Sequence, residues 1–132
     1  MREAVRKRVR MRARFRCEYC GLREEDLPWI TFHVEHIIAK KHGGSDEDSN
    51  LALACDQCNL HKGPNLAGID PAAREVTNLF HPRFDNWNDH FAIHDGLMLG
   101  KTPKGRATVE VCDMNSPQRQ EVRSWLAEFG SD

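Results

Sequence analysis

The stretch CDQCNLHKG, residues 55–63, carries half of one metal site and the start of a second site. Cys55 and Cys58 are three positions apart, a spacing that lets two sulfurs reach one ion at about 2.3 Å each. Asn59 follows Cys58 directly, with Lys62 three residues later, and a structural zinc knuckle needs neither side chain. The stretch therefore predicts a turn and a helix that serve two different sites.

A matching pair of cysteines lies upstream, in CEYC at residues 17–20. Two CxxC pairs separated by 34 residues supply four sulfurs, which complete the tetrahedron of a structural Zn2+ with no open position. The competing interpretation is a redox protein, whose pairs form reversible disulfides and bind no zinc. We expect Cys112, which has no partner pair, to be a core thiol. The predicted zinc ligands are Cys17, Cys20, Cys55 and Cys58.

The segment between the two pairs reads as a strand, a long loop and a second strand. Residues 31–38, TFHVEHII, are rich in β-branched and apolar types, and residues 39–50 form the loop. Residues 51–55, LALAC, make the second strand, and a short helix follows Cys58 and ends at Gly63-Pro64. This order predicts an α+β fold.

Helices and a hairpin flank this core. Apolar residues recur every four positions near the N-terminus, which predicts a helix over residues 2–14. Asp95-Gly96 between apolar runs is typical of a tight hairpin. Two further helices are expected, over residues 103–112 and from Ser116-Pro117 onward. The last helix has an apolar stripe at Val122, Trp125, Leu126 and Phe129.

Charge is distributed unevenly along the chain. Residues 1–16 hold eight Lys or Arg and one Glu, a net charge of +7, whereas residues 17–132 have a net charge of −8. A basic arm on an acidic body indicates contact with a polyanion, and the plain alternative is a solvated helix without a partner. The candidate nucleic-acid contacts are Arg6, Lys7, Arg8, Arg10, Arg12 and Arg14.

Four polar residues in a fixed order suggest the chemistry. Glu35 and His36 are adjacent on the first strand, Asn50 comes 14 residues later, and Asn59 nine after that. With a Gly-Gly pair in the loop between them, this order resembles the signature of the HNH, or His-Me finger, endonucleases over about residues 15–63. The resemblance implies a small ββα-metal core clipped by the four-cysteine zinc site, with an N-terminal helix and C-terminal hairpin and helix additions.

The resemblance also implies a role for each residue. His36 would be the general base that takes a proton from the attacking water. Glu35 and Asn59 would hold a catalytic Mg2+ or Mn2+. Asn50 would brace the loop and help orient the base, and Lys62 would lie near the phosphate.

Two positions depart from the family pattern. Asn59 stands where the family usually has His, which makes an HNN variant, and Ala39 stands where Pro is common, which loses a stiff turn. The chemistry is sound without the family name. Carboxylate and amide oxygens suit a hard divalent cation, and a neutral imidazole can accept a proton near pH 7.

Composition narrows the class of protein. The 132 residues are 39% hydrophobic and 30% charged, which is typical of a globular protein. No apolar run approaches the ~20 residues of a membrane span. The N-terminus lacks the apolar region of a secretion signal, so we expect a cytoplasmic protein with no membrane contact.

We expect residues 1–132 to form one domain, made of a basic helix (1–16), a zinc-clipped core (17–63) and a C-terminal extension (64–132). The expected activity is metal-dependent hydrolysis of DNA phosphodiester bonds, on double-stranded DNA and with weak sequence preference. The alternative is a non-catalytic zinc-ribbon module that binds nucleic acid through its arm. A pure binder has no use for His36 together with Glu35 and Asn59.

Overall fold

The computed structural model describes residues 2–130, which form helices and three separate two-stranded antiparallel sheets. The helices are α1 (Glu3–Arg12), α2 (Asp56–Lys62), α3 (Trp87–His90), α4 (Pro103–Val111) and α5 (Pro117–Phe129). The strands are β1 (His33–His36), β2 (Leu51–Ala54), β3 (Ala67–Ile69), β4 (Val76–Asn78), β5 (Phe91–His94) and β6 (Leu97–Gly100). The predicted α+β class is confirmed.

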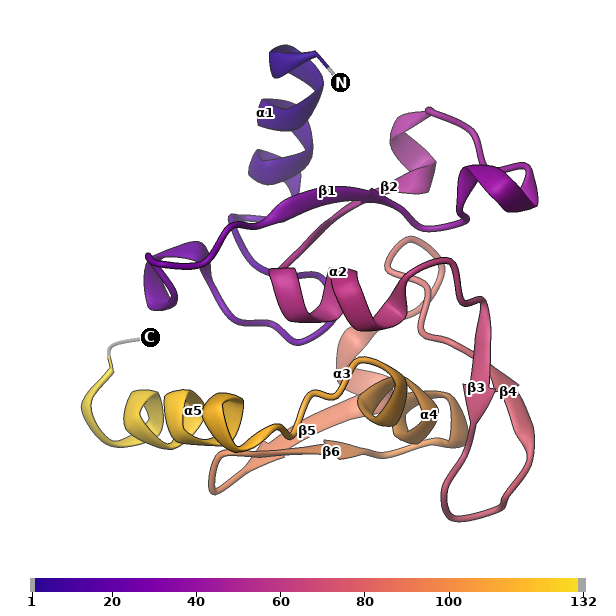
Figure 1. The fold of residues 1–132 in the computed structure, drawn as a ribbon. Helices are drawn as coiled ribbons and strands as arrows, with labels where there is room; N and C mark the ends of the chain where they lie inside the picture. Colours follow the sequence, from indigo (N-terminus) through magenta and orange to yellow (C-terminus); the bar gives the residue numbers. More distant parts are fainter. Residues whose placement is uncertain (1, 131–132) are drawn as a thin grey trace.

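The elements are stacked in tiers (Figure 1). α1 stands above the β1–β2 hairpin, α2 crosses beneath it, and the C-terminal hairpin and helices lie below α2. The predicted order of strand, long loop, strand and helix is confirmed, and this unit holds the expected catalytic residues, whereas Cys17 and Cys20 of the zinc site precede it.

β2 is buried on both faces, and its alternating side chains serve two cores. Leu51 and Leu53 pack with Val9 of α1, whereas Ala52 and Ala54 belong to the larger core that includes the four paired cysteines. β1 pairs with β2 so that Glu35 lies opposite Ala52. Glu35 therefore shares the face that is turned toward α2, and the next residue, His36, shares the opposite face.

β1 is shorter than the strand predicted over residues 31–38. The ladder ends at His36 because the backbone of Ile38 bonds to the side chain of Asn50 in place of a neighbouring strand. The chain then enters the loop, which contains short 3-10 turns at Lys40–His42 and Asp48–Asn50.

α2 begins two residues before Cys58, earlier than predicted. Cys55 is the N-cap residue, and its sulfur accepts a hydrogen bond from the backbone N–H of Cys58 at 3.4 Å. The helix ends at Lys62, as the following Gly63 predicts. The metal-site turn and the helix start are thus one structure.

α1 covers most of the helix predicted over residues 2–14. It stops at Arg12 because Arg14 and Phe15 adopt positive φ angles of 56° and 58°, which a right-handed helix does not allow. Val9 is fully buried against the β1–β2 hairpin, so the helix is anchored by its apolar stripe.

The predicted C-terminal elements are also present. Asp95 and Gly96 form the β5–β6 turn with positive φ angles of 50° and 83°, the combination that suits a two-residue hairpin. Thr102 caps α4 and Ser116 caps α5, each accepting a hydrogen bond from the backbone N–H three residues on. The short β3–β4 hairpin and the single turn of α3 carried no clear sequence signal.

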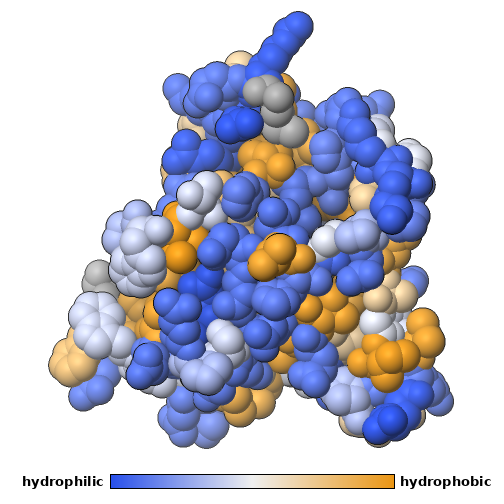
Figure 2. Space-filling view, in the orientation of Figure 1, coloured by the Kyte–Doolittle hydropathy of each residue, from blue (hydrophilic) through white to orange (hydrophobic). Residues whose placement is uncertain are grey.

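The apolar stripe of α5 is only partly covered. Val122 and Leu126 pack against the core, whereas Trp125 and Phe129 are 58% and 64% exposed. Figure 2 shows pale and orange side chains over this end of the molecule. α5 is the longest helix at 13 residues, and none of the helices within residues 2–130 has the length and apolarity needed to cross a membrane.

Candidate active site and metal centre

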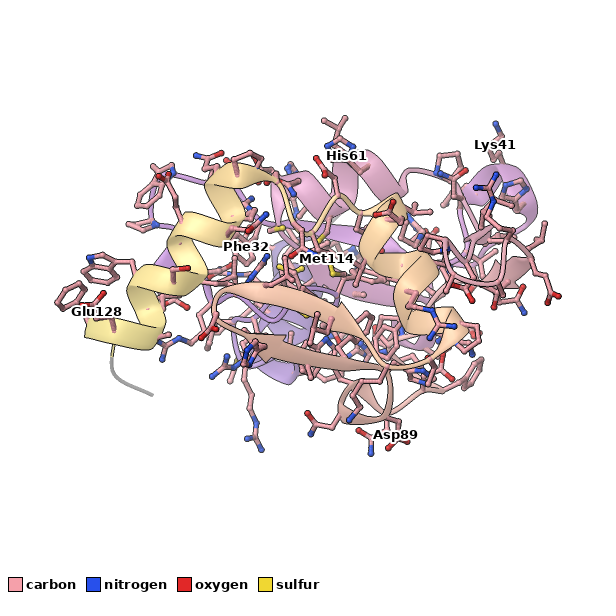
Figure 3. All side chains as sticks on the ribbon, turned by 90° about the horizontal axis from the view of Figure 1, so that it is seen from below. Phe32, Lys41, His61, Asp89, Met114 and Glu128 are labelled. Carbon is pink, nitrogen blue, oxygen red and sulfur yellow. The ribbon has the colours of Figure 1, made fainter. Side chains whose placement is uncertain are left out.

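The two cysteine pairs meet in the interior. The four cysteine sulfurs lie within 4.8 Å of one another, and all four residues are buried. In Figure 3 yellow sulfur atoms gather near the centre of the molecule, close to Met114. Four sulfurs about 2.3 Å from a tetrahedral ion stand about 3.8 Å apart, and Cys20 and Cys55 are separated by 3.9 Å. The cluster can therefore hold a metal ion.

The protonation of the cluster also suits a metal. Hydrogen bonds from Cys17 and Cys20 lower the pKa of the Cys55 thiol, which favours its thiolate form. Burial raises the pKa of Cys17 well above its usual range. These sulfurs are joined by hydrogen bonds between thiol groups, and a bound cation would take the place of the thiol protons. Cys112 is buried in the same core but lies outside the group of four.

His36 has a carboxylate partner that the sequence did not reveal. Its Nε2 lies 2.7 Å from Oδ1 of Asp46, whose other oxygen accepts from the Lys40 ammonium, also at 2.7 Å. The hydrogen bond from Lys40 holds the pKa of Asp46 below its usual range, so this carboxylate is ionised. Because a carboxylate only accepts, Nε2 of His36 donates, and in the neutral imidazole Nδ1 carries the lone pair.

Asn50 connects the two ends of the loop. Its Oδ1 accepts from the Ile38 N–H at 2.8 Å, and its Nδ2 donates to the carbonyls of Ile38 at 3.0 Å and Ser45 at 2.8 Å. The residue is 8% exposed, so these bonds are shielded from water. The side chain thereby fixes the segment that follows His36.

Glu35 is buried beside a buried lysine. Glu35 is 8% exposed and Lys62 is 2% exposed. The distance from Oε1 of Glu35 to the ammonium nitrogen of Lys62 is 3.7 Å. Burial raises the pKa of Glu35 to about 7, against the opposing effect of Lys62. Oε1 has no hydrogen-bond partner among residues 2–130. Oε1 therefore keeps unused acceptor capacity beside the Lys62 ammonium.

Lys62 is buried at the end of α2. Its ammonium donates to the carbonyl of Ile37 at 3.0 Å and lies 5.9 Å from the centre of the Tyr19 ring. These contacts hold it inside the protein, away from any position that an external phosphate could reach in this conformation.

Asn59 lies on α2, opposite β1. It lines a pocket of about 440 Å³ together with His33 and His61. His33 shares a strand face with Glu35, and Figure 3 shows His61 at the edge of the molecule. The structure brings α2 and β1 together, and no hydrogen bond within residues 2–130 joins Glu35 to Asn59.

Half of the basic arm is engaged within the protein. Arg8 makes a two-point contact with Asp48 at 2.6 and 3.0 Å, and Arg12 donates to the backbone carbonyls of Asp48 and Leu51. Arg10 pairs with Glu24 in the same two-point way. The side chains of Arg6, Lys7 and Arg14 have no such partner among the described residues, which leaves these three for an outside ligand.

Residues 17–65 match the family model of the HNH endonucleases. This segment, a little over a third of the chain, contains both cysteine pairs, the β1–β2 hairpin and α2. The resemblance drawn from the sequence is confirmed for this segment, and it supports a nuclease-type function.

A curated relative is the Septu protein PtuB of Bacillus thuringiensis, which is 27% identical to this chain over 112 residues. The alignment covers 79% of this chain and 38% of the relative, so the chain spans less than two fifths of that protein's length. None of the solved structures matches the chain.

Proposed function

We propose that this protein is a metal-dependent endonuclease that hydrolyses DNA phosphodiester bonds, with residues 1–132 acting as one domain. The observation that carries the proposal is the 2.7 Å contact between His36 and Asp46 at the end of β1, where the preceding residue is the buried Glu35. A zinc-ribbon module that only binds nucleic acid has no use for an oriented imidazole at this position.

The proposed general base is Nδ1 of His36. Asp46 accepts the proton of Nε2, which fixes the tautomer and supports the imidazolium that forms when Nδ1 takes a proton from water. Asn50 holds the backbone at Ile38, so the imidazole starts from a defined position. The side chain of His36 is 24% exposed, which gives water and a phosphodiester access to the ring.

Glu35 and Asn59 would hold the catalytic divalent ion. Carboxylate and amide oxygens are hard ligands, which suit Mg2+ or Mn2+. When bound, the ion would supply Lewis-acid assistance to the phosphate and the leaving oxygen. The buried Oε1 of Glu35 supports this assignment, because it accepts no hydrogen bond within residues 2–130 although the Lys62 ammonium lies 3.7 Å away. The four-cysteine cluster is proposed to hold a separate, structural zinc.

DNA is the proposed partner, double-stranded and with weak sequence preference. The net charge of +7 over residues 1–16 and the free side chains of Arg6, Lys7 and Arg14 support contact with phosphates. Phosphate contacts fix position on the duplex without reading sequence.

The test is cleavage of plasmid DNA by His36→Ala. We expect at least a ~100-fold loss of rate, the typical value of general-base assistance, with unchanged zinc content and DNA binding. His33→Ala is the matched control, because His33 lies on the same strand but faces away from Asp46. Cleavage by His36→Ala at the wild-type rate would refute the assignment. If the wild type cuts no DNA with Mg2+ or Mn2+, the binding-module alternative replaces it.

A further inference from the structure

We propose that Lys62 is a positioning residue, which holds the backbone next to His36 from inside the protein and does not contact the DNA phosphate. The inference rests on the proposed function, because it assigns a role in the same site. The observation behind it is the place of the ammonium, which donates to Ile37 one residue after the proposed base.

The surroundings of Lys62 make it an internal group. An ammonium has three donors and no acceptor, and its charge is costly to bury unless it is paired. Here the charge is 3.7 Å from Glu35, beneath the ring of Tyr19, and bonded to the Ile37 carbonyl at 3.0 Å. To reach an external phosphate, Lys62 would have to leave all three contacts and strand the Glu35 carboxylate in the interior.

The segment after His36 is held from two sides. Asn50 bonds the N–H and the carbonyl of Ile38 from the loop, and its own carbonyl accepts from the Ile37 N–H at 2.8 Å. Lys62 bonds the carbonyl of Ile37 from α2. Every backbone N–H and carbonyl of these two residues therefore has a hydrogen-bond partner. Lys62 is the partner that α2 provides.

This two-sided hold matters for the reaction because a general base must start close to its final geometry. A misplacement of about 1 Å can cost a hundred-fold in rate. Lys62 also transmits the position of α2, and hence of Asn59, to β1. One side chain thus sets the spacing between the proposed base and one proposed ligand of the metal.

The experiment compares Lys62→Met with the wild type in two measurements that need no cleavage. The first is the salt dependence of DNA binding without divalent ions, and the second is amide hydrogen exchange at residues 37–38, with β5 and β6 as internal reference. Arg6→Met is the matched control, since loss of one phosphate contact lowers the salt slope by about one. Steady-state cleavage adds a third measurement.

For Lys62→Met we expect a wild-type salt slope, faster exchange at residues 37–38 alone, and kcat lowered at least ~10-fold at unchanged KM. A slope lowered by about one, or unchanged exchange, would overturn the proposal. Should this variant fail to fold, the double variant Glu35→Gln/Lys62→Met removes both buried charges, and the same exchange and slope outcomes decide. A wild type that cleaves no DNA refutes the nuclease function, but the exchange result still decides the positioning role.

Discussion

Adjacent residues on β1 have opposite surroundings. His36 shares a strand face with the residue opposite it, Leu51, and reaches the partly exposed loop at Asp46. Glu35 shares the face turned toward α2 and is buried beside Lys62. The two-residue period of a strand thus separates a partly exposed imidazole from a buried carboxyl group on the residue next to it.

Burial of Glu35 predicts a pH dependence of stability. Its pKa rises from 4.5 to about 7, so the folded protein binds this proton more tightly than the unfolded chain does. The resulting stabilisation is present in full below about pH 4.5 and is lost as pH rises through about 7. The shift corresponds to about 3 kcal/mol.

Urea denaturation from pH 4.5 to 8, without added Mg2+ or Mn2+, measures this dependence. Glu35→Gln is the control, because it removes the titrating group and should flatten the difference over that interval. Parallel curves for the wild type and the variant would contradict the prediction.

For single residues, the sequence predicts which side chains belong to the candidate site better than it predicts which side chains they contact. The HNH-like order singled out His36 and Asn50, since their spacing is local to one hairpin. Asp46 could not be chosen from the acidic run SDEDSN, because the choice depends on how the loop closes. The burial of Lys62 could not be predicted either, because helix spacing alone does not say what covers the helix end.

Among the elements, the loop between β1 and β2 determines the shape of the site. It folds back so closely that Gly44 lies against the end of β1. A Cβ atom on Gly44 would stand 1.7 Å from the Ile38 carbonyl oxygen and 2.9 Å from Nδ2 of Asn50. Its neighbour Gly43 has open space around it but a φ angle of +84°. The two glycines are therefore required for different reasons.

Alanine substitutions should separate these two requirements. Gly43→Ala should cost about 1 kcal/mol of unfolding free energy, the penalty for an L-residue in the left-handed region, and should leave cleavage nearly intact. Gly44→Ala should cost more, because it forces the loop off Ile38 and breaks the bonds of Asn50, worth about 1–3 kcal/mol where they are buried. Urea unfolding and plasmid cleavage measure both effects, and equal losses in the two variants would contradict this account.

Elements with strong local signals were predicted, and those without were not. The α1 stripe, the β1–β2 pair and the Asp95-Gly96 turn each depend on residues close together in sequence. β3 and β4 are three residues each, and their hairpin is stabilised from outside, by the two-point contact of Arg106 in α4 with Asp70 at 2.8 Å. A contact between residues 36 positions apart leaves no periodic trace in the sequence.

On the scale of the whole molecule, the cysteine cluster joins the turn after α1 to the start of α2. The C-terminal segment packs against the same helix, where Arg119 donates to Asp56 at 2.8 Å. Nothing in the sequence indicated this second use of α2, because an arginine and an aspartate 63 positions apart are an ordinary pair of surface types.

Loss of one cysteine should therefore unfold the protein. Cys20→Ser removes one of four thiolates, and structural zinc of this kind contributes about 10 kcal/mol or more of apparent binding free energy. We expect insoluble or unfolded protein, assayed by circular dichroism. Elemental analysis of the soluble wild type should find one zinc per chain.

Cys112→Ala is the matched control, because Cys112 is equally buried but outside the cluster. It should keep one zinc per chain, and its free energy of unfolding should fall only by the cost of a small cavity. Soluble, folded Cys20→Ser with the wild-type metal content would contradict the four-cysteine assignment.

The spacing of the two cysteine pairs also sets the timing of assembly during synthesis. Cys20 and Cys55 are 35 residues apart, and translation at about 5–20 residues per second separates their emergence by roughly two to seven seconds. During that interval the first pair has no partner, and α1 does not yet have β2 to pack against. If the four cysteines bind zinc, we expect the first two thiols to stay reduced until the second pair leaves the ribosome.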